Sequence, residues 1–122
     1  HKPVGIDVEK MKAIDMDIAK RFFHKTEFHA LLNRDPSARL SHFFDLWTLK
    51  ESYIKAVGKG LHLPLDSFAL ELKEGKWAPV VGESGETYSF KQYALEEGYK
   101  LSVCSTCQHF PERIRFVTAE EL

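Results

Sequence analysis

The hydrophobic positions of this chain alternate at first, then follow a helical spacing, and alternate again in the second half. Residues 4–9 read Val-Gly-Ile-Asp-Val-Glu, and this alternation predicts a strand. Ile6 and Val8 are expected to face the core, so Asp7 and Glu9 share the opposite face of the strand. Two carboxylates on one face of a short strand are the first candidate for chemistry.

Helical spacing governs the next part of the chain. Asp15 is a suitable N-cap for a helix over residues 16–24, and Thr26 for a short second helix. The pair Asp35-Pro36 is typical of a helix start, because proline suits the first helical position. The long helix that follows is expected to end near Val57, before two closely spaced glycines.

Strand patterns fill the rest of the chain. They cover residues 67–72, 86–95, 99–105 and 113–118. Helices early and strands late predict an α+β fold, in which helices pack on a mostly antiparallel sheet. A length of 122 residues without repeats or linkers indicates a single domain over residues 1–122.

Composition narrows the partners and the compartment. The 17 basic and 18 acidic side chains leave a net charge of −1, so there is no basic footprint for nucleic acid or an anionic membrane surface. No apolar run reaches the roughly 18 residues of a membrane span. Two cysteines fit a reducing compartment better than a disulfide framework, so we expect a cytoplasmic protein with neither nucleic acid nor membrane as a partner.

On the long helix, one glutamate and one lysine lie at the edge of the apolar stripe. At about 100° per residue, Glu51 and Lys55 fall about 40° and about 80° beyond Trp47, where a helix meets a neighbouring element. Such positions suit site residues, although a Glu–Lys pair at i, i+4 is also an ordinary surface feature. Lys50 falls inside the stripe, where it either snorkels to solvent or meets a buried charge.

The two strand carboxylates and the helix glutamate form a candidate magnesium site. Residues i and i+2 of a strand project about 6.6 Å apart on one face, and Asp7 reaches less far than Glu9, so their oxygens can converge. Mg²⁺ prefers such hard oxygen ligands and leaves positions for water and phosphate. If Glu51 joins them, each pair of charges about 4 Å apart repels by about 4 kcal/mol, so the cluster needs a cation. A solvated strand face is the alternative interpretation of Asp7 and Glu9.

A family resemblance adds to this interpretation. It rests on G-I-D-V-E at residues 5–9 and W-T-L-K-E-S-Y-I-K-A at residues 47–56. These strings are similar to the two signature motifs of the 4′-phosphopantetheinyl transferases. The whole chain resembles the C-terminal half of members of the surfactin-synthetase-activating (Sfp) type. The resemblance implies one half of a fold with two-fold pseudo-symmetry, whose N-terminal half is absent from this chain.

The resemblance implies an enzyme that moves the 4′-phosphopantetheine arm of coenzyme A, its co-substrate, onto a serine of an acyl or peptidyl carrier protein, releasing 3′,5′-ADP. It implies that Asp7, Glu9 and Glu51 hold Mg²⁺ against the pyrophosphate, and that Lys55 neutralises charge on the phosphate. It further implies that Glu51 takes the serine proton, directly or through water. Glu51 and Lys55 are therefore the expected catalytic residues and coenzyme A contacts. The expected setting is nonribosomal peptide or polyketide synthesis, including antibiotic biosynthesis.

The segment from Lys10 to Phe23 is where, by the same resemblance, the carrier protein binds. Lys12 and Lys20 are placed to meet an acidic helix of the carrier, and Met16 and Ile18 offer apolar contact. The alternative is that the lysines form a solvated face and that the two apolar residues belong to the core.

Two other interpretations stay open. A complete holo-acyl-carrier-protein synthase, which works as a trimer, has about this length. Its members carry a Ser-x-[Ser/Thr]-His-like strand near the C-terminus, whereas Leu101 to Cys107 contains no histidine. A non-catalytic interaction module could use the same acids to cap a protein interface. The Sfp-type half fits better, and its expected partners are a carrier protein and the missing N-terminal half.

Overall fold

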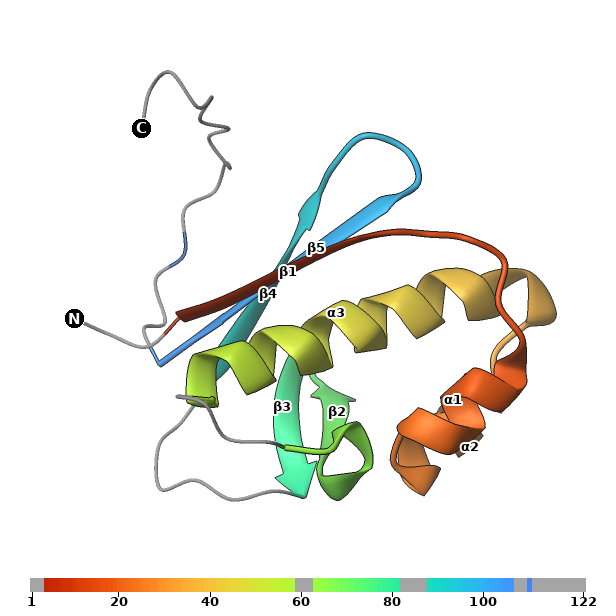
Figure 1. The fold of residues 1–122 in the computed structure, drawn as a ribbon, viewed down its shortest axis with the longest axis horizontal. Coiled ribbons are helices and arrows are strands. Elements are labelled where there is room, and N and C mark those ends of the chain that lie inside the picture. The colour runs from red at the N-terminus through yellow and green to blue at the C-terminus, as the bar shows by residue number, and fades with distance from the viewer. Residues whose placement is uncertain (1–3, 59–62, 82–87, 107–109, 111–122) are drawn as a thin grey trace.

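The computed structural model describes residues 4–58, 63–81, 88–106 and 110. In chain order it contains β1 (Val4–Lys10), α1 (Met16–Phe22), α2 (Lys25–Leu32), the 3₁₀ turn η1 (Pro36–Ala38), α3 (Arg39–Val57), the 3₁₀ turn η2 (Leu65–Ser67), β2 (Ala69–Lys73), β3 (Lys76–Val81), β4 (Ser89–Ala94) and β5 (Tyr99–Ser105). The α3 helix lies between a three-stranded sheet and a layer formed by the β2–β3 hairpin, α1 and α2 (Figure 1). Every strand pair is antiparallel, so the predicted α+β class is confirmed. None of the described helices has the length and apolar character needed to span a membrane.

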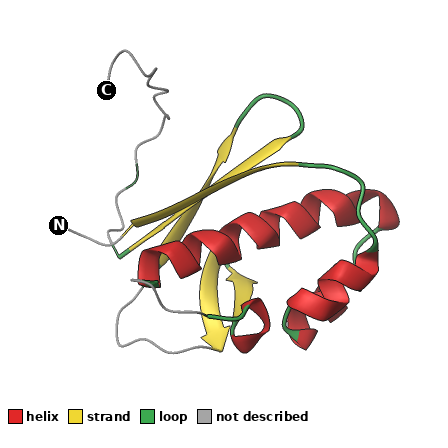
Figure 2. Ribbon diagram, viewed as in Figure 1, coloured by secondary structure: helices red, strands yellow, loops and turns green. Residues whose placement is uncertain are grey.

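The three-stranded sheet, in the order β1-β5-β4, turns one face to α3 and leaves the other uncovered by the described elements (Figure 2). The prediction that Ile6 and Val8 face the core is wrong, because their side chains are 52% and 51% exposed on the outer face. Asp7 and Glu9 do share a face, and it is the face toward α3. The polar face of β1 therefore packs toward α3, and its apolar face is exposed.

Gly5 explains how β1 comes so close to α3. A Cβ atom added at Gly5 would lie 1.9 Å from the carbonyl oxygen of Ser52, well inside van der Waals contact. Only glycine allows this approach. The helix is also joined to β5, where the Thr48 and Ser102 hydroxyl oxygens lie 2.8 Å apart and are fully buried. The backbone of β1 is thus held directly against the helix that carries Glu51.

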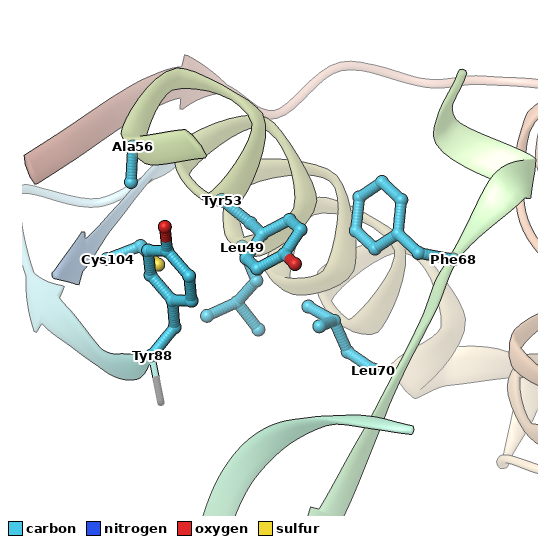
Figure 3. Close-up of a cluster of buried hydrophobic side chains, with 7 residues drawn as sticks. All are labelled: Leu49, Tyr53, Ala56, Phe68, Leu70, Tyr88 and Cys104. Carbon is cyan, nitrogen blue, oxygen red and sulfur yellow. The ribbon is translucent and has the colours of Figure 1, made fainter. Parts of the chain in front are cut away.

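Two hydrophobic clusters anchor α3. The first, shown in Figure 3, joins the end of α3 to both sheets through Leu49, Tyr53, Ala56, Phe68, Leu70, Tyr88 and Cys104. The second joins the start of α3 to α1 and α2 through Ala19, Phe23, Leu31, Phe43, Phe44 and Leu46. Trp47 packs against this second cluster, with its ring centroid 5.7 Å from that of Phe43, and so helps to fix the helix.

The side chain of Asp15 caps α1 as predicted, although α1 ends at Phe22 instead of residue 24. Asp35 caps the 3₁₀ turn η1, so the long helix α3 begins at Arg39 and not at the predicted Pro36. Thr26 does not cap α2, because His24 accepts a hydrogen bond from the Thr26 N–H and Glu27 completes a capping box.

The strands differ more from the prediction. β5 covers the predicted residues, and β2 and β4 lie close to the predicted ranges. β3 was not predicted from the sequence. It follows a tight turn at Glu74-Gly75, both with positive φ, and it contains Pro79, which argues against a strand in the sequence. The predicted strand at 113–118 lies outside the described residues.

Candidate active site

One ion pair joins the first strand to the long helix. The ammonium group of Lys55 lies 2.8 Å from Asp7 Oδ1 and donates a second hydrogen bond, 3.1 Å long, to the carbonyl oxygen of Ile6. Asp7 is 5% exposed, whereas the Lys55 side chain is 51% exposed. The structure therefore brings together two of the predicted site residues, one buried and one reaching in from solvent.

Only one of the two carboxylate oxygens of Asp7 has a hydrogen-bond partner among the described residues. Its Oδ2 atom is buried and accepts no hydrogen bond from the described residues. Glu9 lies beside it: burial raises the pKa of Glu9 to about 7, and the negative charges of Asp7 and Glu51 add to the rise. Ionisation of Glu9 therefore places a second negative charge beside Asp7, and the positive charge of Lys55 offsets part of it.

Glu51 lies near the same charges. Burial raises the pKa of Glu51, the negative charge of Asp7 raises it further, and Lys55 opposes both. Glu51 also raises the pKa of Glu9. The three predicted acids thus interact electrostatically, from β1 on one side and from α3 on the other.

In the described part of the chain, these acids do not form a preformed metal-binding site. No three His, Cys, Asp or Glu side chains there are close enough together to hold a metal ion as they stand. Like charges without a cation separate, and Lys55 takes the nearest oxygen of Asp7. The donor set still fits Mg²⁺, because all three groups offer hard carboxylate oxygens and Asp7 Oδ2 is a buried acceptor with no donor.

Beside Glu51 runs a cavity of about 510 Å³. Its lining includes Arg21 and Phe22 at the end of α1, and Ile54 of α3. The segment that leads into η2 also lines it, with Leu63, Pro64, Leu65 and Asp66. Sequence analysis missed Arg21 and Phe22 as site residues, because the 41% exposure of Phe22 appears only in the structure. A larger cavity of about 610 Å³, between α2, α3 and the β2–β3 hairpin, contains none of the three acids.

The predicted carrier-binding residues lie between residues 12 and 20. This segment directly precedes Arg21 and Phe22, which line the cavity of about 510 Å³ beside Glu51. Lys12 and Lys20 are exposed. Met16 and Ile18 are half-buried and pack against the second hydrophobic cluster, which is the core role considered as the alternative.

Comparison with known proteins supports the fold and identifies the family. A family model described as the 4′-phosphopantetheinyl transferase superfamily matches residues 3–104. The chain belongs to that superfamily.

Among individual relatives, the chain is 46% identical to 4′-phosphopantetheinyl transferase Sfp of Bacillus subtilis strain 168, over 99% of this chain and 54% of that protein. It is 42% identical to 4′-phosphopantetheinyl transferase gsp of Aneurinibacillus migulanus, over 84% of this chain and 44% of that protein. The chain therefore spans about half the length of these relatives.

Solved structures show the same fold at low identity. Holo-[acyl-carrier-protein] synthase of Thermotoga maritima superposes with a TM-score of 0.71 at 20% identity, covering 86% of this chain and 63% of that one. A holo-(acyl-carrier-protein) synthase of Bacillus anthracis, solved in complex with coenzyme A (3′,5′-ADP), gives 0.69 at 16% identity, covering 84% and 93%.

Proposed function

We propose that this chain is the C-terminal half of an Sfp-type 4′-phosphopantetheinyl transferase, which modifies carrier domains of peptide or polyketide synthetases in the cytoplasm. The observation that carries the proposal is the meeting of Asp7, Glu9, Glu51 and Lys55 at the junction of β1 and α3. Relatives bearing this activity in their names match nearly the whole chain.

In the proposed reaction, the hydroxyl of a carrier serine attacks the phosphorus that bears the pantetheine arm of coenzyme A. A new bond forms between the serine oxygen and this phosphorus, and the bond from phosphorus to the bridging oxygen breaks. The electron pair leaves on 3′,5′-ADP. Glu51 accepts the serine proton, directly or through water, as the general base. Lys55 neutralises charge on the phosphate under attack.

Asp7, Glu9 and Glu51 are the residues that would hold Mg²⁺. A bound Mg²⁺ would orient the diphosphate and neutralise its charge, which is the main contribution that phosphoryl transfer needs. The buried and unpaired oxygen of Asp7 supports this assignment.

The test uses Glu51→Gln in the intact enzyme, with coenzyme A, Mg²⁺ and an apo carrier protein, and follows the mass of the carrier. We expect kcat/KM to fall by about 10²- to 10⁴-fold, as for loss of a general base. Glu71→Gln is the matched control, because Glu71 is an exposed glutamate of β2 away from the acids. Wild-type transfer and Mg²⁺ dependence in Glu51→Gln would refute the catalytic assignment and favour the non-catalytic interaction module.

We propose the N-terminal half of the same enzyme as the partner of the open sheet face. Val4, Ile6 and Val8 are each more than half exposed there, which forms an apolar strip along β1. The relatives have nearly as much sequence again outside the matched region. Burying this strip against the other half would explain why the apolar side of β1 points away from α3.

Calorimetry on the isolated chain tests this partnership. We expect little or no coenzyme A binding by the chain alone, and binding once the N-terminal half is added in trans. Ile6→Lys should prevent the recovery and leave the stability of the isolated chain within about 0.5 kcal/mol, since the side chain is exposed. Tight Mg²⁺-dependent coenzyme A binding by the chain alone would contradict the half-site and favour a complete synthase, whose trimer would appear in the solution mass.

A further inference from the structure

Two lysines on α3, Lys50 and Lys55, each pair with a buried carboxylate, but only one of them can leave it. Lys50 is fully buried, and its ammonium group is held by both Glu27 and the carbonyl oxygen of Phe68. Lys55 is half-exposed, and its ammonium group is held by Asp7 and the carbonyl oxygen of Ile6. Moving Lys55 away from its partner exposes no new cavity in the core.

Asp7 needs a positive charge next to it. A carboxylate that is 5% exposed has lost nearly all its hydration, and Glu9 and Glu51 add negative charge nearby. In the described part of the chain, Lys55 is the cation paired with Asp7. It occupies Oδ1 and leaves Oδ2 without a donor.

We propose that Lys55 is an internal counterion that competes with Mg²⁺ for Asp7, and that cation binding releases it toward the phosphate of coenzyme A. The inference rests on the proposed function, because it concerns the same acids. A divalent cation bound to Asp7 repels an ammonium group less than about 3 Å from one of its oxygens, so the two positive charges exclude each other. The released ammonium group then becomes available to the incoming anion, which couples metal binding to phosphate binding.

The test is a calorimetric titration of the 122-residue chain with MgCl₂. Lys55→Met should bind Mg²⁺ about two- to fivefold more tightly than wild type, the effect of removing one half-exposed competing ion pair. Lys55→Arg, which keeps the charge, should stay near wild type. Lys73→Met removes one exposed lysine of β2 and controls for the change in net charge.

A second measurement follows the ammonium signals of Lys50 and Lys55 by NMR in the wild-type chain, which avoids any variant that fails to fold. The Lys55 signal should move with added Mg²⁺ at the same midpoint as the calorimetric curve, and the Lys50 signal should not move. If wild type binds Mg²⁺ and Glu51→Gln weakens that binding, but Lys55→Met leaves it unchanged or weaker, the counterion role is wrong and the metal site stands. If neither wild type nor Lys55→Met binds Mg²⁺, both are wrong.

Discussion

Lys50 and Glu27 form an ion pair inside the molecule, with the side chains 0% and 2% exposed. Glu27 also accepts hydrogen bonds from the backbone N–H groups of His24 and Leu70, and Lys50 donates to the carbonyl oxygen of Phe68. One pair of charges thus ties the start of α2, the middle of α3 and the start of β2 together. Lys50, which makes this connection, directly precedes Glu51 in the chain.

Removing one partner of this pair should be severe. Lys50→Met leaves the Glu27 carboxylate buried without its cation, and we expect a loss of about 3–5 kcal/mol in the free energy of unfolding. Lys50→Met combined with Glu27→Gln should be less damaging than the sum of the single changes, because the amide oxygen still accepts from Leu70 and carries no charge. Urea denaturation measures both. Strict additivity would mean that the two residues do not act as a pair.

The exposed pair of Lys73 and Glu71, 3.7 Å apart, is the control, and Lys73→Met should change stability by less than about 0.5 kcal/mol.

Gly5→Ala should separate β1 from α3. The new Cβ would lie 2.5 Å from the backbone nitrogen of Ala56 as well as 1.9 Å from the Ser52 carbonyl oxygen, so one backbone must move. We expect a loss of about 3 kcal/mol or more, measured by thermal and urea unfolding. Gly75→Ala is the comparison: its Cβ meets nothing within 4 Å, and its φ of +76° should make the change cost about 1–2 kcal/mol. Equal losses at the two positions would contradict the close approach at Gly5.

His42 should make the fold sensitive to acid. Burial lowers the pKa of His42 to about 4 from 6.5, and the nearby positive charge of Arg34 adds to the effect. Below pH 6.5 the unfolded chain binds a proton that folded His42 does not bind, so stability falls as the pH drops from 6.5 to 4. His42→Gln should remove a fall of about 2–3 kcal/mol over this range, measured by urea denaturation at a series of pH values. Parallel stability curves for wild type and variant would show that His42 titrates normally.

Lys12 and Lys20 should govern the affinity for the carrier protein in the intact enzyme. Both are exposed, on the stretch of chain that leads into the cavity beside Glu51. Replacing them with glutamate should raise the KM for the carrier about three- to tenfold and leave the KM for coenzyme A unchanged, because the surface charge steers the protein partner. Lys73→Glu, on β2, should change neither. A rise in both KM values would indicate damage to the site instead of loss of a docking contact.

The sequence predicted the helices better than it predicted which face of β1 is buried. Alternation along β1 correctly grouped Asp7 with Glu9, but it could not say which face is inside. The usual assumption, that the apolar face is buried, failed because Gly5 lets the polar face pack against α3. That choice depends on an atom-level approach between distant parts of the chain, which periodicity does not contain.

Other differences have the same origin. Whether Lys50 snorkels or pairs depended on Glu27, which is on another helix. The cavity beside Glu51 is also lined by Leu63, Pro64, Leu65 and Asp66, which follow no periodic pattern. Nothing in the spacing of these residues therefore indicates that they belong to a site. By contrast, Glu51 and Lys55 were found at the edge of the stripe because helix geometry alone fixes their direction.

The pairing of β1 with β5 also constrains how the chain folds. The first strand forms its ladder with the last described one, from Val4 opposite Ser105 to Lys10 opposite Tyr99. This ladder cannot form until Tyr99–Ser105 have been synthesised, and contacts so distant along the chain slow folding. Until then the backbone of β1 is unpaired and open to association with other nascent chains, so folding at low protein concentration should improve the yield of native protein.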